Sequence, residues 1–327
     1  HRDLHRLIRR QRQMCIRDRY AALSGSSDGS IGGVQRQTSF LAKWLSARGH
    51  EVSMITWDEG QPHGQVIDGV TVYKLCRRDA GIRGLRFLWP QWTSLRAAMR
   101  RADADVYYQN CAGYETGQVA MWCRRHKRAF VYSVANDPEC ERELRTLPKL
   151  RERVLYRYGL RHADRVITQT TRQRDTLLRD FGVESTVIPM PCAGPVDNSA
   201  ESLSASTRRI LWLGRVCEQK RPDVLLDLAE ANTVWEFDLV GPAGNGAYVA
   251  GVMDRAKRQR NVTVHGPVHW DRVSDFYRNA FCLLCTSAFE GFPNTFLEAW
   301  SHGLPIVSTF DPDGIIASRR LGIVAKD

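Results

Sequence analysis

Long hydrophobic runs are missing from this sequence. No stretch approaches the roughly 18–20 consecutive apolar residues of a membrane-spanning helix, and no apolar signal-peptide core follows the basic start. The sequence also lacks a Gly-x-Gly-x-x-Gly fingerprint and a P-loop. The nine cysteines are scattered, and the close pair Cys282 and Cys285 has no second pair at zinc-finger spacing. We therefore expect reduced thiols and a cytoplasmic protein.

The overall composition is that of a folded protein with a basic excess. Hydrophobic residues make up 43% and charged residues 25% of the chain, which excludes a largely disordered, collagen-like or coiled-coil protein. A length of 327 residues suggests about two domains, each able to bury a core. The formal net charge of +11 is by itself compatible with a nucleic-acid partner.

The first nineteen residues supply much of that charge. They hold seven arginines and two aspartates, a net charge of +5, and they show no periodicity typical of a helix or strand. Residues 14–18 also read as the translation of a common sequencing-library adapter. We therefore interpret residues 1–19 as a non-native segment and exclude them from the fold.

Three basic runs remain, at residues 96–101, 124–128 and 255–260. Each falls on a predicted helix or at its end, where cations are solvated or interact with the C-terminal helix dipole. A surface for anionic membrane lipid is the alternative interpretation. Nucleic acid is not expected as a partner, because no stacking aromatics interleave with these basic residues.

Strand and helix patterns alternate along the chain and predict an α/β fold. Strands separated by helices indicate parallel sheets with right-handed crossovers, and the alternation restarts near residue 209. We predict an N-terminal domain at 20–195, a linker rich in Ser, Ala, Asn and Pro at 196–207, and a C-terminal domain at 208–327. Only residues 20–23 precede Gly25 where an apolar first strand is usual, and the sequence stops at Asp327 directly after a strand-like run. We therefore expect truncation at both ends.

The most informative segment is FEGFPNTFLEAWSHGLPIVST, residues 289–309. We expect a helix that Asn294 or Thr295 caps and that ends near His302, before Gly303. The first backbone amides of a helix have no partner within it, and the helix dipole there favours an anion. The start of this helix is therefore a candidate phosphate site.

Two carboxylates accompany this helix. Glu298 lies one turn into the helix and Glu290 lies on the loop before it, so both are expected at the carboxyl edge of a parallel sheet, where open α/β sheets bind ligands. Carboxylates accept hydrogen bonds and therefore suit ribose or hexose hydroxyls. The alternative is an ordinary helix with a capping acid and a surface acid.

Two cations follow a predicted strand in the segment at 211–231. Arg215 and Lys220 flank the turn before a helix, where they can neutralise a pyrophosphate. Charge-assisted hydrogen bonds of this kind contribute roughly 1.5–3 kcal/mol each. Solvated loop cations are the alternative.

A glycine-rich loop at 29–34 opens the first helix of the N-terminal domain. Glycines at a helix N-terminus permit close approach of the backbone to a phosphate or sugar. A plain flexible turn explains the same residues equally well.

Together these segments resemble the retaining glycosyltransferases of the GT-B fold, family 4, also called glycosyltransferase group 1. The resemblance covers about residues 24–327, and the segment at 287–309 is its most specific part. It implies two Rossmann-like α/β/α domains whose parallel sheets face each other across a cleft. It also implies transfer of a hexosyl unit, with retention, from a UDP- or GDP-sugar to a hydroxyl acceptor. No cofactor beyond this donor and no metal is expected.

The resemblance implies roles for individual residues. Glu298 would bind the nucleotide ribose and Glu290 the donor sugar, while Arg215 and Lys220 would stabilise the leaving diphosphate. Glu290, Arg215 and Lys220 are thus the candidate catalytic residues. The nucleotide-sugar site would comprise Gly32, Gly33, Gly241, Val268, Gly291, Phe292, Pro293, Asn294, Thr295, Phe296 and Glu298.

The acceptor side departs from the family pattern. Histidines that many relatives carry at two strand ends are absent, and residues 135–137 read Ala-Asn-Asp. Loop capping is the alternative role for the polar residues found there. The acceptor candidates are Gln109, Asn110, Tyr114, Glu115, Asn136 and Asp137.

Other functions remain as alternatives to a transferase. One is a non-catalytic relative that binds a sugar nucleotide, and another is a sugar-nucleotide epimerase of the same fold. A basic nucleic-acid binder would show steeply salt-dependent binding to any duplex.

Overall fold

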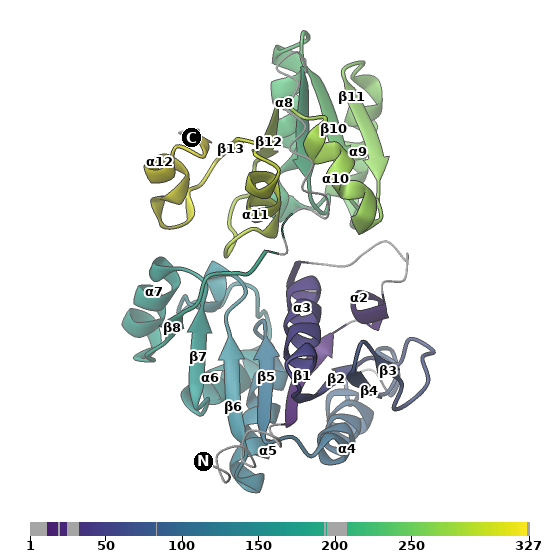
Figure 1. Cartoon of the computed structure of the whole chain (residues 1–327), viewed down its shortest axis with the longest axis vertical. Helices are drawn as coiled ribbons and strands as arrows, with labels where there is room; N and C mark the ends of the chain where they lie inside the picture. Colours follow the sequence, from purple (N-terminus) through teal and green to yellow (C-terminus); the bar gives the residue numbers. More distant parts are fainter. Residues whose placement is uncertain are drawn as a thin grey trace. The chain divides into compact units, whose positions relative to one another are not determined.

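The computed structural model describes residues 12–18, 20–24, 33–82, 84–192, 194 and 208–325. The chain divides into two compact units, residues 1–189 and 190–327 (Figure 1). Each unit is a parallel sheet flanked by helices, as the alternating pattern predicts. The predicted linker at 196–207 lies outside the described residues.

The first unit is built on an eight-stranded sheet in the order β3-β4-β2-β1-β5-β6-β7-β8. Neighbouring strands pair parallel, except that β3 runs antiparallel to β4. The strands are β1 (Arg12–Asp18), β2 (Glu51–Thr56), β3 (Val66–Ile67), β4 (Val70–Lys74), β5 (Val106–Asn110), β6 (Ala129–Ser133), β7 (Arg165–Thr168) and β8 (Thr186–Val187).

The exclusion of residues 1–19 from the fold is wrong for strand β1. β1 pairs with both β2 and β5 and occupies the place of the first strand that the sequence analysis found missing. A strand at this position provides partners for the backbone groups of two neighbouring strands, which would otherwise be unsatisfied. The apolar centre of β1 is only three residues long, so its pattern gives no strand signal. That residues 1–19 are non-native stays a prediction.

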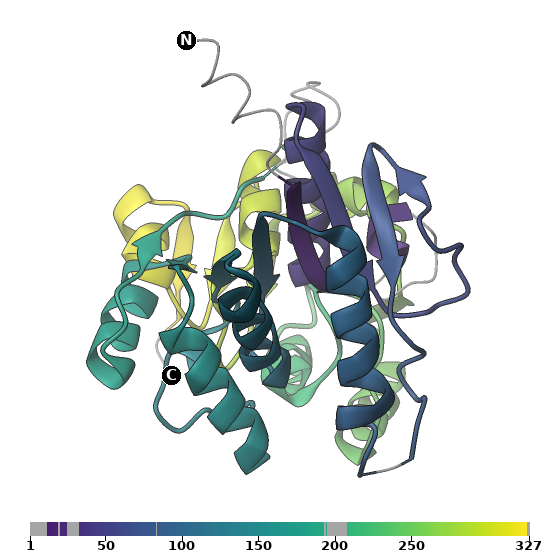
Figure 2. The same cartoon turned by 90° about the horizontal axis from the view of Figure 1, so that it is seen from below.

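Helices cover both faces of this sheet (Figures 1 and 2). Because side chains alternate along a strand, Met54 of β2 packs in the cluster beside α2 and α3, while its neighbour Ile55 packs in the cluster with α4, α5, α6 and α7. The helices are α2 (Tyr20–Ser24), α3 (Gly33–Ala47), α4 (Thr93–Ala102), α5 (Tyr114–His126), α6 (Leu150–Arg161) and α7 (Thr171–Phe181), with short turns η1 (Phe87–Trp92) and η2 (Asp137–Glu139).

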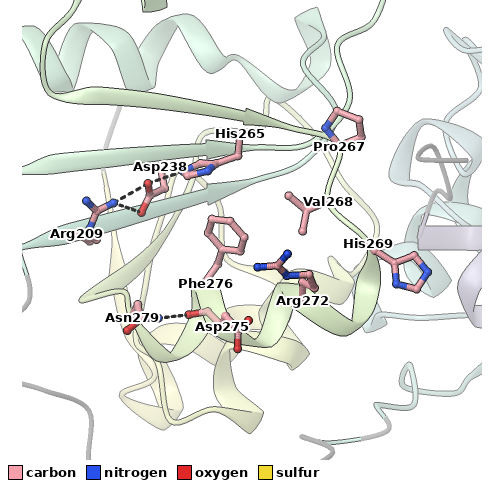
Figure 3. Close-up of a pocket in the computed structure, with 10 residues that line it drawn as sticks. All are labelled: Arg209, Asp238, His265, Pro267, Val268, His269, Arg272, Asp275, Phe276 and Asn279. Atoms are coloured by element: carbon pink, nitrogen blue, oxygen red, sulfur yellow. Dashed lines mark hydrogen bonds and ion pairs between the residues drawn. The ribbon is translucent and has the colours of Figure 1, made fainter. Parts of the chain in front are cut away.

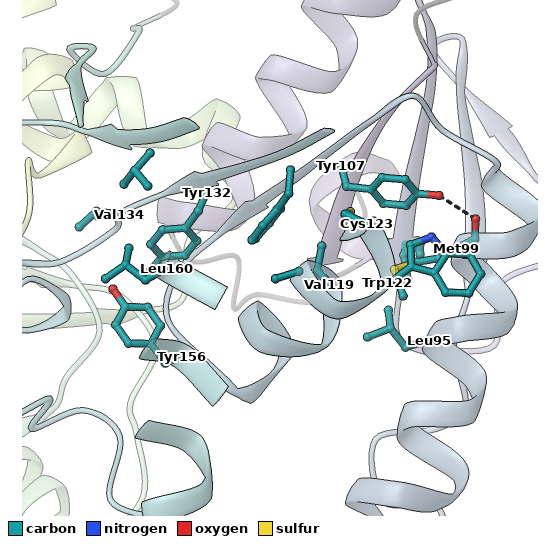
Figure 4. Close-up of a cluster of buried hydrophobic side chains, with 14 of the residues drawn as sticks. Leu95, Met99, Tyr107, Val119, Trp122, Cys123, Tyr132, Val134, Tyr156 and Leu160 are labelled. Atoms are coloured by element: carbon teal, nitrogen blue, oxygen red, sulfur yellow. Dashed lines mark hydrogen bonds between the residues drawn. The ribbon is translucent and has the colours of Figure 1, made fainter. Parts of the chain in front are cut away.

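Three tyrosines are among the largest buried side chains of the larger cluster (Figure 4). Tyr107 donates its hydroxyl hydrogen to the carbonyl oxygen of Met99 at 3.0 Å. Tyr132 and Tyr156 lie edge to face, with ring centroids 5.7 Å apart. Each ring thus fills the core while its hydroxyl keeps a partner, which avoids the cost of burying an unpaired polar group.

The second unit is built on a six-stranded, wholly parallel sheet in the order β11-β10-β9-β12-β13-β14. The strands are β9 (Arg209–Leu213), β10 (Glu236–Val240), β11 (Val262–Gly266), β12 (Cys282–Cys285), β13 (Ile306–Ser308) and β14 (Gly322–Val324). The helices are α8 (Pro222–Ala231), α9 (Ala247–Arg258), α10 (Trp270–Arg278), α11 (Asn294–Ser301) and α12 (Ile315–Arg319), with turns η3 (Glu218–Lys220) and η4 (Pro312–Gly314).

Two hydrophobic clusters show which helices cover each face of the second sheet. Trp212 and Leu239 pack with residues of α8 and α9. Leu211 and Val240, one position along their strands, pack with residues of α10, α11 and α12. The three basic runs fall on helices α4, α5 and α9 or at their ends, as predicted.

Helices α5 and α6 cross at two glycines with no room for a side chain. A Cβ atom on Gly117 would lie 2.4 Å from the carbonyl oxygen of Leu155, and one on Gly159 would lie 2.4 Å from Thr116. These two positions therefore fix the spacing of the two helices that cover β5 and β6. The carboxyl ends of those strands carry most of the acceptor candidates.

We expect Gly117→Ala to destabilise the chain by about 1–3 kcal/mol, because the backbones of α5 and α6 must move apart. Gly251→Ala in α9 is the matched control: a Cβ there meets nothing within 4 Å, so we expect a gain of about 0.5–1 kcal/mol from helix propensity. Thermal and urea unfolding measure both. Equal effects of the two substitutions would contradict the close crossing.

Candidate functional site

Two loops are joined at the carboxyl edge of the second sheet. Strands β9 and β12 are neighbours, so the turn after β9 and the loop after β12 emerge side by side. The amide of Ala288 donates to the carbonyl oxygen of Gln219 at 2.8 Å, and Nε2 of Gln219 donates to the carbonyl oxygen of Phe289 at 2.9 Å. These bonds hold the residues that follow in each loop next to one another.

Lys220 and Glu290 form an ion pair at this junction. Nζ of Lys220 donates to Oε1 of Glu290. Glu290 is 7% exposed, and a carboxylate buried to this extent needs a cation or hydrogen-bond donors to offset its lost hydration. An ammonium has three N–H donors, so this pairing leaves donors on Lys220 for a second anion. The structure thus brings two of the predicted catalytic side chains together.

Thr286 contacts the backbone of the turn that carries Lys220, a role that was not predicted from the sequence. Its hydroxyl oxygen accepts a hydrogen bond from Nε1 of Trp212 at 2.9 Å. The same oxygen lies 2.7 Å from the carbonyl oxygen of Lys220 and 2.8 Å from that of Arg221, so it can donate to either. A threonine after an apolar strand carries no signal for this role, since its partners lie more than 60 residues away.

The start of helix α11 differs from the sequence prediction. The helix begins at Asn294, its N-cap is Pro293, and no side chain caps it, so the prediction of a cap by Asn294 or Thr295 is wrong. The amide of Phe296 donates to the carbonyl oxygen of Pro293 at 3.1 Å, so it is not one of the unpartnered amides that we expected. Proline lacks an N–H and has a fixed φ, and both features suit a helix start.

Glu298 is oriented by helix α10. Its Oε2 accepts a hydrogen bond from the hydroxyl of Tyr277 at 2.9 Å. Tyr277 is buried and stacks on His302, with ring centroids 5.1 Å apart. The Nδ1 atom of His302 lies 2.8 Å from the carbonyl oxygen of Glu298. Tyr277 was not anticipated, because it lies in an amphipathic helix where an aromatic residue is expected in the core.

Arg215 is an exposed residue in a firmly held turn. The amide of Gly214 donates to the carbonyl oxygen of Val240 at 3.0 Å, and the amide of Val216 donates to that of Pro242 at 3.0 Å. Gly241 makes this approach possible: its φ is +138°, and a Cβ there would lie 1.9 Å from the carbonyl oxygen of Gly214. The turn therefore presents the Arg215 side chain at the same sheet edge, while Gly241 has a structural reason to be glycine.

A groove of about 580 Å³ lies between the sheet and helix α10 (Figure 3). On its sheet wall, Asp238 is 6% exposed and accepts hydrogen bonds from Nη1 of Arg209 at 2.9 and 3.0 Å. Nε2 of His265 lies 2.7 Å from Oδ1 of Asp238. This row of three polar side chains, Arg209, Asp238 and His265, was not predicted, because strands with alternating apolar residues predict an apolar wall.

The mouth of the groove is mixed in character. Val268, a predicted nucleotide-sugar residue, lines it together with Pro267, Phe276 and Arg272. The rings of Phe276 and His265 lie edge to face at 4.8 Å. Apolar and aromatic walls with a cation at the rim suit a planar heterocycle that carries a phosphate.

The acceptor candidates lie on the first unit, and most make local hydrogen bonds. Nε2 of Gln109 donates to the carbonyl oxygen of Cys111 at 2.9 Å, the hydroxyl of Tyr114 donates to Gln91 at 2.8 Å, and Asp137 accepts from Gln173 at 3.0 Å. These contacts fit the loop-capping alternative. The amide Nδ2 of Asn136 likewise donates to Glu139, at 3.4 Å.

Gln109 and Asn110 each carry a side-chain oxygen that takes no part in this local hydrogen bonding. Oε1 of Gln109 and Oδ1 of Asn110 are buried and have no hydrogen-bond partner among the described residues. Buried polar atoms in folded proteins are nearly always satisfied, so these oxygens have a hydrogen-bonding capacity that the described residues do not meet. Glu115 is buried in the first turn of α5, Gly33 is the exposed first residue of α3, and Gly32 lies outside the described residues.

Glu139, in turn η2, is a fully buried carboxyl that the sequence analysis missed. Its Oε2 accepts hydrogen bonds from the hydroxyl of Tyr132 at 2.6 Å and from the amide of Ala135 at 3.1 Å. Burial raises the pKa of Glu139 above its ordinary value, and the two hydrogen bonds oppose that effect only in part. Glu139 thereby fixes the loop that carries Asn136 and Asp137.

We expect Glu139→Gln to change how the stability of the chain depends on pH. Because the pKa of Glu139 is raised in the folded state, folding binds a proton between the unfolded and folded pKa values, and wild-type stability falls as pH rises through that interval. Glutamine keeps an acceptor for Tyr132 but does not titrate. The melting temperature of the variant relative to wild type should therefore be higher at pH 8 than at pH 5. A difference independent of pH would refute the raised pKa.

Two Asp-x-Asp triplets, a pattern often associated with metal binding, occur in the sequence and have other partners in the structure. Asp103 and Asp105 accept hydrogen bonds from the guanidinium of Arg128 at 2.6 and 2.8 Å. The carboxylate of Asp311 accepts from the amides of Ile316 and Ala317 at 2.8 and 3.1 Å and so holds the start of α12. The ion pairs with Arg128 explain the first triplet, and the start of α12 explains Asp311 of the second.

Family models match both units of the chain. Residues 32–193 match the model described as Glycosyl transferase 4-like domain, and residues 207–326 match the model described as Glycosyl transferases group 1. Together the two matches cover most of the sequence.

Curated relatives agree with these matches. The chain is 34% identical over 104 residues to lipopolysaccharide 1,6-galactosyltransferase of Salmonella typhimurium, a match covering 30% of this chain and 29% of that enzyme. It is 19% identical over 290 residues to the amylovoran biosynthesis glycosyltransferase AmsD of Erwinia amylovora, covering 85% of this chain and 77% of that protein.

Solved structures share the fold. Sucrose-phosphate synthase from Thermosynechococcus elongatus superposes with a TM-score of 0.70 at 19% identity and covers 93% of this chain and 82% of that chain. A UDP-GlcNAc 2-epimerase from Methanocaldococcus jannaschii superposes with a TM-score of 0.57 at 12% identity, covering 96% of this chain and 89% of that chain. At such low identities the likeness concerns the fold alone.

Proposed function

Because the chain belongs to the group 1 glycosyltransferases of the GT-B fold, we propose that it transfers a hexosyl unit, with retention, from a UDP- or GDP-sugar to a hydroxyl acceptor. The acceptor class is a glycan, a lipid-linked glycan or a small molecule, in line with the lipopolysaccharide and amylovoran enzymes to which the chain is similar. The proposed reaction requires no metal ion.

The observation that carries this proposal is the Lys220–Glu290 ion pair at the carboxyl edge of the second sheet. Breaking a glycosyl–phosphate bond places growing negative charge on the diphosphate. Lys220, with Arg215 on the preceding turn and the first amides of α11, would stabilise that charge more in the transition state than in the ground state.

Glu290 would receive hydroxyl groups of the donor sugar. Its carboxylate is buried and already holds one cation, so it offers acceptors in a site of low solvent access. Glu298 would bind the ribose in the orientation that Tyr277 gives it. The base would lie at the mouth of the groove beside Val268.

The remaining parts of the proposal concern partners and location. Gln109 and Asn110 would contribute the first acceptor contacts through their buried oxygens. We place the protein in the cytoplasm with peripheral contact to an anionic membrane. Among the described residues, no helix has the length and apolar character needed to cross a bilayer.

We expect Glu290→Gln to lower transfer and donor hydrolysis by at least 100-fold while the chain stays folded, because the amide keeps the shape but not the charge at the reacting face. Glu230→Gln, an exposed acid paired with Arg255 in the same unit, is the control and should retain activity. Turnover of UDP- and GDP-sugars with and without acceptor, together with a thermal melt, measures the effect. Normal turnover in folded Glu290→Gln would contradict the proposal.

We expect Arg215→Ala to weaken nucleoside-diphosphate binding about 10-fold or more, since it removes one charge-assisted hydrogen bond. Free sugar should bind as in the wild type. Arg258→Ala, an exposed cation of α9, serves as the control for charge alone. Thermal shifts with UDP, GDP and ADP report the affinity, because a ligand that binds only the native state raises the melting temperature. An equal loss of nucleoside-diphosphate affinity in both variants would show that Arg215 is not part of the diphosphate site.

An epimerase remains the second candidate, favoured by the solved epimerase that shares this fold. The two reactions are separated by their products. A changed sugar in the donor, formed without any acceptor, would indicate epimerisation, whereas free nucleoside diphosphate and a glycosylated acceptor indicate transfer. Nucleotide binding with neither product would indicate a non-catalytic relative.

A further inference from the structure

A cluster of exposed hydrophobic side chains lies on the first unit, far in sequence from every proposed site residue of the second unit. It comes from two segments, one around turn η1 and one at the start of helix α6. We call it the Trp89 surface; its members, with their exposed fractions, are Ile82 (68%), Leu85 (60%), Leu88 (57%), Trp89 (65%), Leu150 (76%) and Val154 (55%).

The two segments adjoin in space. The guanidinium of Arg151, in α6, lies 5.0 Å from the ring centroid of Phe87, in η1. Both segments line one shallow hollow of about 580 Å³, with Gly84 and Arg86 on one side and Lys149 and Leu150 on the other. Because Leu150 and Val154 are four residues apart in α6, they share a helix face. The turn that carries Leu85, Leu88 and Trp89 therefore adjoins the start of α6, which carries Leu150 and Val154.

Basic residues adjoin this apolar surface. The segment at 80–92 contains two arginines and no aspartate or glutamate. Arg86, Lys149 and Arg151 line the hollow itself. One acid adjoins them: the carboxylate of Glu152 forms an ion pair with Nζ of Lys149 at 3.7 Å. Apolar side chains with cations among them are the composition of a surface that inserts into the interface of an anionic membrane.

We propose that the Trp89 surface docks the first unit on an anionic phospholipid bilayer, which deepens the peripheral membrane contact of the proposed function. Trp89 and the leucines would enter the boundary between headgroups and acyl chains, where indole rings are favoured. Arg86, Lys149 and Arg151 would remain at the phosphate level, since long basic side chains lay their stems along apolar surface and keep their charge in water.

A second copy of the chain fits this surface less well. A two-fold contact would bring the same patch of both copies together. It would bury Arg86, Lys149 and Arg151 of each copy, with Glu152 as the acid paired to one of them. Anionic headgroups supply the missing negative charge, at about 1 kcal/mol per basic residue near the surface. The charges therefore favour a bilayer.

Co-sedimentation of the whole chain with phospholipid vesicles tests the proposal. We expect binding to vesicles of phosphatidylcholine with 30% phosphatidylglycerol, little binding to pure phosphatidylcholine, and weaker binding as salt is raised. Lys149→Ser with Arg151→Ser should weaken partitioning roughly 30-fold, the factor that corresponds to two basic residues. Arg258→Ser with Arg260→Ser removes the same charge from the other unit and should leave binding unchanged.

The apolar half of the surface has its own matched pair of variants. Leu88→Ser with Trp89→Ser should weaken partitioning at least 10-fold, because the inserted apolar area is lost. Val66→Ser with Val234→Ser replaces two side chains of similar exposure, 62% and 64%, elsewhere on the chain, and should bind as the wild type does. Tryptophan fluorescence that shifts to the blue with vesicles, and does not shift in the Trp89 variant, would locate the contact.

Several outcomes would overturn the proposal. Equal binding to both kinds of vesicle, loss of binding in the control pairs as large as in the test pairs, or a stable dimer that Leu88→Ser with Trp89→Ser dissolves would each do so. Thermal shift with UDP and GDP is run on every variant. If the wild-type chain binds nucleotide normally but does not bind vesicles, the membrane-docking proposal alone is rejected. If the wild-type chain binds no nucleotide, the proposed function is rejected.

Discussion

The ion pair between Lys220 and Glu290 is the constraint on which the rest of the candidate site depends. These residues are 70 positions apart, and they meet only because β9 and β12 are neighbours in the sheet. Burying a carboxylate costs several kcal/mol unless a cation accompanies it, so the pair and the Gln219 contacts hold both loops in one arrangement. Arg215, the start of α11 and the Val268 end of the groove then lie at the same carboxyl edge of the sheet.

Most strands and helices could be predicted from the sequence, because each pattern is local. The apolar residues of β12 and the three- and four-residue spacing in α3 reflect burial within one element. The cap of α11 could not be predicted, since asparagine, threonine and proline all favour a helix start and only the backbone of the loop selects among them. Strand β1 was missed because its place is determined by its two neighbours and hardly by its own short apolar core.

The residues of the candidate site could be predicted only where they lie within a local sequence motif. Glu290 and Glu298 stand out because both lie within one recognisable stretch. Lys220 was also predicted, from a second segment, but its pairing with Glu290 and the bond from Tyr277 to Glu298 join separate segments and have no signal in the sequence. Thr286, Glu139 and the Asp238 row are held by contacts between distant segments, and no spacing in the sequence encodes such contacts.

The Trp89 surface and the acceptor candidates are linked within the first unit. Tyr114, an acceptor candidate at the start of α5, donates a hydrogen bond to Gln91 of turn η1 and packs edge to face against Phe87 at 5.0 Å. Turn η1 therefore exposes Trp89 while its residues Phe87 and Gln91 contact Tyr114. A displacement of this turn on docking would be transmitted to Tyr114 through these two contacts, so the proposed membrane surface and the acceptor candidates share one structural element.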